Sequence, residues 1–171
     1  MTGRLVTPTL MHVDALRKFL EAVEDAGEAL PFDPPSKAPL DVISRYIDNL
    51  ARGFWTSEQA LETESISHHY WYMLDDEILG QATLRSELRG EFGQTHGHVG
   101  YGISPLHRNR GHGTHLLGLL LEKARESGLK SVLITCAPSN LASRRVIERN
   151  SGVWKDRYAE QYERFEVDLS E

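Results

Sequence analysis

The sequence predicts one domain of the mixed α/β class, with helices on both faces of a single sheet. In residues 98–137 an amphipathic helical pattern lies between two strand patterns, which is typical of a parallel strand–helix–strand unit. Residues 69–85 hold two strand patterns separated by a short turn, which predicts an antiparallel hairpin. The 171 residues include 40 % hydrophobic and 26 % charged residues, which suits one domain with a hydrophobic core.

The first third of the chain predicts one strand and two helices. Val13, Leu16 and Leu20 recur at helical spacing after Thr9, a residue type that can cap a helix. Four prolines in ten residues predict a loop before the second helix. The expected elements are a strand at 4–8, a helix at 9–27, a proline-rich loop at 30–39, a helix at 40–52 and a polar surface loop at 55–67.

The rest of the chain supplies most of the sheet. The strand expected at 98–104 is rich in glycine, which weakens a strand unless another group must approach its backbone. The apolar run at 131–137 is typical of a strand buried on both faces. The expected elements are strands at 69–75 and 78–85, a loop at 87–97, a strand at 98–104, a helix at 114–127, a strand at 131–137, a helix from 138 to 150 and one or two strands within 153–169.

Composition narrows the classes of partner. The net charge of −6 argues against a nucleic-acid surface as the main partner. No apolar run approaches the length of a membrane span, and the chain start lacks the apolar core of a signal peptide. A single cysteine, Cys136, excludes an internal disulfide framework, and its place in an apolar strand indicates a buried, inert thiol. We therefore expect a cytoplasmic protein with no nucleic-acid or membrane partner.

The turn at 108–113 is the strongest functional signal. A strand that feeds a glycine turn and then a helix offers free amides and the positive end of a helix dipole to an anion. Arg108 and Arg110 add charge suited to phosphate oxygens. The dinucleotide fingerprint fails because Leu116 stands where a third glycine or alanine is required, and no P-loop string exists. Local positive charge on an acidic chain predicts a small polyanionic ligand.

This turn belongs to a longer string, Ile103-x-Pro105-x-x-Arg108-x-x-Gly111-x-Gly113. The string resembles the acyl-CoA pyrophosphate loop of the GNAT superfamily of N-acetyltransferases. A second element of that family, residues 140–149, follows one strand later, and residues 68–154 are similar to a bacterial branch of predicted acetyltransferases. The resemblance implies the GNAT fold, a mixed and mostly antiparallel sheet in one domain over residues 1–171, with acetyl-CoA as cosubstrate.

The resemblance also implies residue roles. The backbone of Ile103 would bind the pantetheine arm, and Asn140 would contact the pantetheine or its thiol end. The pyrophosphate would be held by amides of Arg108, Asn109, Arg110, Gly111, His112, Gly113 and Thr114. No metal is expected, since His112 and His115 are spaced as chelating residues but no third ligand completes the set locally.

Catalysis requires a group that takes a proton from the amine. Many relatives place a glutamate before or within the strand that ends at the loop, and here that region offers Glu91, His96 and His98. We favour His98, because an imidazole has an unperturbed pKa near ~6.5, and keep Glu91 as second choice. The alternative is that His98 only satisfies a backbone carbonyl in a glycine-rich strand.

The acid for the leaving thiolate is unassigned. Many relatives carry a tyrosine in the last helix, but the corresponding residue here is Ile147. Ser143 could lie near the sulfur, or could simply pack the start of its helix. Tyr158 and Tyr162 are more distant candidates.

We therefore expect an N-acetyltransferase that moves an acetyl group from acetyl-CoA to a primary amine of a small molecule or peptide by direct attack. The missing tyrosine favours an alternative, a catalytically silent CoA-binding or regulatory module. A third hypothesis is an interaction domain whose turn binds another anion. The acceptor is not identified: Arg85 is either a surface charge, which we prefer, or a clamp for an acceptor carboxylate. A homodimer is common in the family and is possible here.

Overall fold

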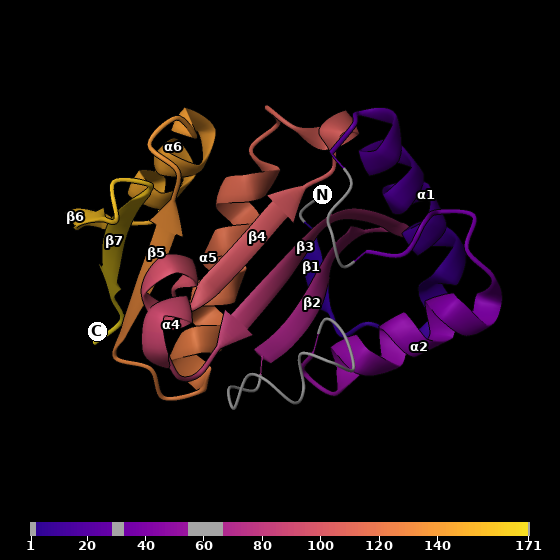
Figure 1. Cartoon of the computed structure of the whole chain (residues 1–171), viewed down its shortest axis with the longest axis horizontal. Coiled ribbons are helices and arrows are strands. Elements are labelled where there is room, and N and C mark those ends of the chain that lie inside the picture. The colour runs from indigo at the N-terminus through magenta and orange to yellow at the C-terminus, as the bar shows by residue number, and fades with distance from the viewer. Residues whose placement is uncertain (1–2, 29–32, 55–66, 171) are drawn as a thin grey trace.

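One seven-stranded sheet organises the molecule, in the order β1-β2-β3-β4-β5-β7-β6 (Figure 1). In this computed structural model, β4 and β5 run parallel and the other five neighbouring pairs run antiparallel. The predicted mixed, mostly antiparallel sheet is therefore confirmed. The strands are β1 (Arg4–Val6), β2 (Ser67–Leu74), β3 (Glu77–Arg85), β4 (Val99–Ile103), β5 (Ser131–Cys136), β6 (Val153–Tyr158) and β7 (Tyr162–Asp168).

The structure describes residues 3–28, 33–54 and 67–170. The start of the expected proline-rich loop and residues 55–66 of the expected surface loop lie outside them. None of the described helices combines the length and apolar character that crossing a bilayer requires. The helices are η1 (Leu10–His12), α1 (Val13–Asp25), α2 (Leu40–Ala51), α4 (Gly90–His96), η2 (Pro105–His107), α5 (His112–Glu126) and α6 (Leu141–Arg149).

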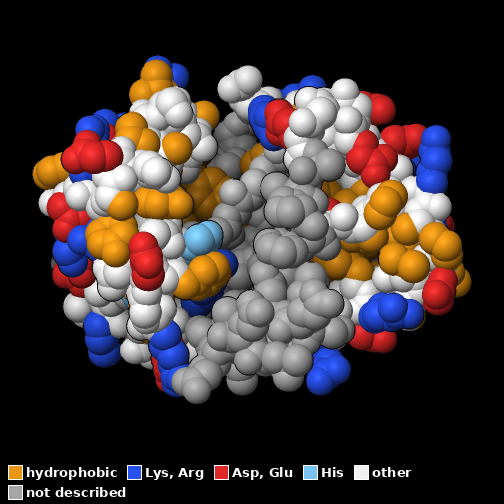
Figure 2. All heavy atoms as spheres, viewed as in Figure 1, with side chains coloured by type: hydrophobic (Ala, Val, Ile, Leu, Met, Phe, Trp, Pro, Cys, Tyr) orange, Lys and Arg blue, Asp and Glu red, His pale blue; other side chains and the backbone are white. Residues whose placement is uncertain are grey.

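Two hydrophobic cores lie on opposite faces of the sheet. On one face the leucines of α5 and Ile147 of α6 pack against the strands. On the other face α1 and α2 pack against Trp71, Met73 and Ile78. Figure 2 shows charged side chains of both signs over the surface, with hydrophobic side chains among them on the side of α1 and α2 and on the opposite side of the view. Helices thus cover both faces, as the sequence predicts.

Strand alternation decides which residues face α1 and α2. Ala82 and Leu84 of β3 belong to the core beneath α5. Because successive strand residues point to opposite faces, Thr83 and Arg85 lie on the α1–α2 face. In β4, Val99 belongs to the α5-side core, so its glycines face the same way as Arg85.

Three local predictions need correction. Residues 87–97 are not a loop throughout, because α4 forms at Gly90–His96. Its only buried residue is Gly93, so it carries no apolar periodicity to reveal it. Thr9 makes no side-chain capping bond, and the first helix begins as η1 before α1. The preferred interpretation of Arg85 as a surface charge is wrong, since only 6 % of it is exposed. Cys136 is buried, as predicted.

Candidate active site

β4 and β5 are joined at one end and separate toward the other. The His98 amide donates to the Leu133 carbonyl at 2.8 Å, and Val99 pairs with Ile134. Within the described residues no further register pair joins the two strands. The parallel ladder therefore ends after the first residue of β4 and leaves a gap beyond it.

The main chain of β4 faces this gap at alternate residues. Toward β3, the Arg85 amide donates to His98 at 2.7 Å and the Ser104 amide donates to Leu79 at 2.8 Å. In an antiparallel pair these bonds recur at every second residue. The amides and carbonyls of Tyr101 and Ile103 therefore point away from β3, toward the gap.

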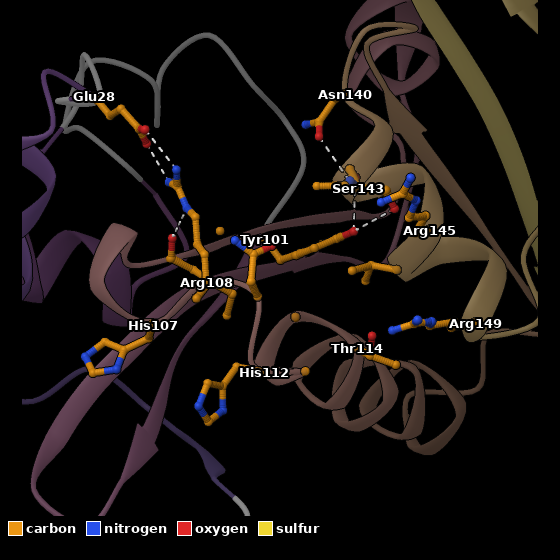
Figure 3. Close-up of a pocket in the computed structure, with 17 residues that line it drawn as sticks. Glu28, Tyr101, His107, Arg108, His112, Thr114, Asn140, Ser143, Arg145 and Arg149 are labelled. Atoms are coloured by element: carbon orange, nitrogen blue, oxygen red, sulfur yellow. Dashed lines mark hydrogen bonds and ion pairs between the residues drawn. The ribbon is translucent and has the colours of Figure 1, made fainter.

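A pocket of about 660 Å³ lies along the gap (Figure 3). Residues of β4, the turn after it, the start of α5 and one side of α6 form its walls. The lining residues are Glu28, Tyr101, Gly102, Ile103, His107, Arg108, Asn109, Gly111, His112, Gly113, Thr114, Asn140, Ala142, Ser143, Arg145, Val146 and Arg149. We call it the larger pocket.

The turn before α5 is shaped to present amides to this pocket. Asn109 and Gly111 have φ angles of 60° and 83°, in the left-handed region. Gly111 is also the N-cap of α5, and a Cβ on it would meet no atom within 4 Å. The first amides of a 15-residue helix therefore face open space with no side chain in the way. Such an arrangement binds anions.

Two arginines of α6 add positive charge to the same pocket. Arg145 and Arg149 are four residues apart, which places them on one helix face, and both line the larger pocket. Neither forms an ion pair within the described part of the chain. Arg144 binds Glu148 at 2.9 Å and Glu163 at 3.4 Å instead. Helical spacing in the sequence could have singled out Arg149.

Arg108 is held by the protein itself. Its Nε donates to the Ile103 carbonyl at 3.0 Å, and its guanidinium binds the Glu28 carboxylate, with one contact at 2.8 Å. This hydrogen-bonded pair lowers the pKa of Glu28. The side chain that sequence analysis expected near a phosphate is therefore already paired.

Tyr101 bridges the gap to α6. Its hydroxyl lies 3.0 Å from Ser143 Oγ, and Asn140 Oδ1 accepts the Ser143 amide at 3.0 Å (Figure 3). Burial raises the pKa of Tyr101 to about 12, so the phenol keeps its proton at neutral pH. Sequence analysis missed this residue, and Ile147, at the position of the missing tyrosine, is fully buried.

A second, smaller pocket of about 250 Å³ lies on the α1–α2 side of β4. Its own lining consists of Phe19, Val23, Gln81, Ala82, Thr83, Arg85 and Gly100. It shares Glu28, Tyr101, Gly102, Ile103 and Arg108 with the larger pocket. The two pockets therefore meet along the second half of β4. Gly102 keeps this meeting place open, because a Cβ there would touch nothing within 4 Å.

Most of the predicted CoA-binding residues line the larger pocket, whereas the two predicted bases do not line either pocket. All of the predicted CoA-binding residues except Arg110 line the larger pocket. Glu91 is exposed in the first turn of α4, and neither Glu91 nor His98 lines either pocket. The Leu133 amide donates to His98 Nδ1 at 2.9 Å, so the backbone partner of the ring is an amide and not a carbonyl.

The histidines at the start of α5 are engaged with Tyr72. Its hydroxyl lies 2.9 Å from His115 Nδ1 and 3.5 Å from His112 Nδ1. Among the described residues, no three histidine, cysteine or acidic side chains are grouped as metal ligands are.

Comparison with known proteins agrees with this architecture. The sequence model of the Acetyltransferase (GNAT) family matches residues 38–153. The chain belongs to the GNAT acetyltransferase family. No curated protein matches the chain significantly.

Solved GNAT-like structures share the fold at low sequence identity. The GNAT domain of S. lividans PAT is 18 % identical, with a TM-score of 0.64 over 98 % of this chain and 90 % of that one. The microcin C7 self-immunity acetyltransferase MccE, solved with acetyl-CoA and AMP, is 13 % identical, with a TM-score of 0.67 over 98 % and 93 %. The ribosomal L7/L12 α-N-protein acetyltransferase RimL, solved with coenzyme A, is 14 % identical, with a TM-score of 0.67 over 99 % and 96 %. At these identities the likeness shows the fold alone.

Proposed function

We propose that this GNAT protein is a cytoplasmic, single-domain N-acetyltransferase that moves the acetyl group of acetyl-CoA to a primary amine of a small molecule or peptide. The observation that carries the proposal is the meeting of two pockets along β4, the larger of which presents the amides of a helix N-terminus to an anion. A thioester in the first pocket would be open to an amine in the second. The structures of MccE with acetyl-CoA and RimL with coenzyme A give this cosubstrate a precedent in the same fold.

Coenzyme A would lie along the larger pocket. Its pyrophosphate would take the amides of the turn that ends at Thr114, and Arg145 and Arg149 would pair with phosphate charge. The pantetheine amides would continue the sheet by bonding the main-chain groups of Tyr101 and the amide of Ile103, which point into the gap. The thioester would then reach Tyr101, which lines both pockets.

The reaction needs one bond formed and one broken. The amine lone pair attacks the thioester carbon and forms the C–N bond, and collapse of the tetrahedral intermediate breaks the C–S bond. The amine loses a proton, and the departing sulfur gains one. We assign the stabilisation of that sulfur to the Tyr101 hydroxyl, with Ser143 and the N-terminus of α6 beside it. With a pKa of about 12, Tyr101 would act as a hydrogen-bond donor to the thiolate.

The role of His98 as base needs a free ring nitrogen. Because Nδ1 accepts the Leu133 amide, the proton of the neutral ring lies on Nε2. Neutral His98 then has no lone pair left for an amine proton. We propose that water in the smaller pocket takes this proton, that His98 holds β4 to β5, and that Glu91 on the surface has no part in the step.

Two substitutions of His98 separate these roles. His98→Asn keeps a side-chain acceptor for the Leu133 amide, whereas His98→Ala removes it. We expect His98→Asn to retain the wild-type pH–rate profile and turnover within about threefold, and His98→Ala to lose about 1 kcal/mol of stability. Equal losses of turnover in both variants, together with loss of the acidic limb of the profile, would show that His98 is the base. Steady-state rates from pH 6 to 9 and thermal unfolding measure both.

Acetyl transfer itself is tested by calorimetric titration with CoA and by CoA release from acetyl-CoA over a panel of amines, amino acids and peptides. We expect micromolar CoA affinity and amine-dependent release of CoA. CoA binding without turnover of any amine would favour the silent CoA-binding module, which the buried Ile147 supports. Failure to bind CoA would contradict both.

A further inference from the structure

Arg85 is a buried cation whose charge no described side chain neutralises. It is the last residue of β3, is 6 % exposed and lines the smaller pocket. Its Nη1 donates to the Gly97 carbonyl at a long 3.4 Å, and its guanidinium lies 5.2 Å from the centre of the Phe92 ring. Among the described residues, no carboxylate lies within ion-pair distance of it. Burying a charge without a counter-ion is costly, which favours a functional reason for it.

Within residues 3–28, 33–54 and 67–170, no neighbour adds negative charge beside Arg85. Burial lowers its pKa to about 10. Three histidines lie near enough for its charge to lower their own pKa values, and these are His69, His96 and His98. The other charged residues of the smaller pocket, Glu28 and Arg108, neutralise each other. Counting only its described lining residues, the pocket thus carries one uncompensated positive charge.

The rest of the smaller pocket suits a compact ligand with an apolar body. Phe19 and Val23 give it apolar walls, and its volume of about 250 Å³ suits a small molecule and not a folded chain. A Cβ on Gly100 would lie 3.9 Å from Arg85 Nη1, so the guanidinium sits beside the backbone of β4. From Gly100 to the meeting place of the pockets at Gly102 is about 7 Å along the strand.

We propose that the acetyl acceptor is a small amine that also carries a carboxylate, and that Arg85 binds this carboxylate while the amine reaches the thioester. The inference rests on the proposed acetyl transfer and names the substrate class of that same site. A guanidinium binds a carboxylate through two parallel N–H donors, so it would fix the orientation of the acceptor as well as neutralise the pocket. Amino acids with small apolar side chains fit the charge, the walls and the volume.

The test compares each acceptor with the same molecule lacking its charge. We would assay apolar amino acids from alanine to leucine, including β- and γ-amino acids. Each acid is compared with its amide and with the amine that lacks the carboxylate. We expect the wild type to prefer acids over amides by about 10- to 100-fold in kcat/KM. In Arg85→Gln the acids should fall to the level of the amides, while the amides keep their rates.

Two controls make the outcome decisive. Arg89→Gln makes the same substitution at an exposed arginine outside both pockets and should keep the preference. CoA affinity, measured by calorimetry, should be unchanged in Arg85→Gln, because Arg85 does not line the larger pocket, and unchanged affinity would also show that the variant folds.

Each contrary result has a distinct meaning. Amides that react as fast as acids, a preference that survives in Arg85→Gln, or CoA binding with no acid turned over would each overturn the inference. A preference for phosphorylated amines over carboxylates would overturn it too. Failure of the wild-type protein to bind CoA would instead overturn the proposed acetyl transfer.

Discussion

The two pockets on either side of β4 are built in different ways. The larger pocket is built around main-chain groups, namely the amides before α5 and the edge of β4 that faces the gap at Tyr101 and Ile103. The smaller pocket is lined by side chains of α1 and β3 and by the glycine backbone of β4, and its charge comes from Arg85. A site made by the main chain serves one fixed ligand. A site made by side chains can come to bind a different acceptor by substitution, without disturbing the fold.

The largest change in CoA affinity should come from blocking the larger pocket. Gly111→Leu projects a side chain into the open larger pocket and should weaken CoA binding by about 100-fold or more, since it blocks the amides that hold the anion. Gly128→Leu is the matched control. Gly128 follows α5, has a φ of 90° and also faces open space, so its variant carries similar backbone strain away from both pockets. Calorimetric titration with CoA checks both, and equal CoA affinity in the two variants would contradict the placement.

The next largest effect should be on acceptor binding in the smaller pocket, with CoA binding unchanged. Gly100 lines only that pocket, its φ lies outside the left-handed region, and its Cβ would make ordinary contact with Arg85. Gly100→Ala and then Gly100→Val should raise the KM for the acceptor stepwise, by about 10-fold or more for valine, because the added volume fills the pocket. CoA affinity should stay constant. A loss of CoA affinity that parallels the change in KM would mean that the pockets do not act separately.

A smaller effect is expected where the pockets meet. Tyr101→Phe removes the hydroxyl assigned to the leaving sulfur and should lower kcat by about 10-fold at unchanged CoA affinity. It should also cost about 1 kcal/mol of stability through the lost bond to Ser143. Tyr158→Phe, on β6, is the control and should leave kcat unchanged. An unaltered kcat in Tyr101→Phe would contradict the role of Tyr101 and leave Ser143 and the N-terminus of α6 as the donors to the thiolate.

The smallest effect concerns the ion pair shared by both pockets. Glu28→Gln removes a negative charge from the rim and releases Arg108 toward a phosphate, so CoA affinity should rise by about 2- to 5-fold and the gain should shrink at high salt. Glu126→Gln removes a surface partner of Lys123 at the far end of α5 and should change nothing. Weaker CoA binding in Glu28→Gln would mean that the pair holds the turn in shape.

The sequence predicted the larger pocket well because its parts are local. A turn with glycines at fixed positions, and the second element at Asn140 one strand later, can be recognised without knowing the fold. The parallel pairing of β4 with β5 also followed from the strand–helix–strand order. What could not be predicted is the early end of that ladder, which lets Tyr101 reach Ser143, 42 positions further along the chain.

The smaller pocket was not predictable for a related reason. Alternation along β3 groups Thr83 with Arg85, but it does not say whether a helix covers that face. The Arg85 guanidinium lies against Phe92 of α4, and α4 has no apolar periodicity. His98 has the chemistry of a base, whereas its bond to the Leu133 amide, on which we base its proposed role between β4 and β5, is visible only in the folded chain.

Acetyl transfer as proposed here requires the thioester to lie where the two pockets meet. A crystal structure with bound acetyl-CoA would locate it. We expect the pyrophosphate on the amides between Gly111 and Thr114, the pantetheine in the gap between β4 and β5, and the acetyl carbon beside Tyr101 and open to the smaller pocket. Acetyl-CoA bound elsewhere, or a thioester closed off from the smaller pocket, would contradict it.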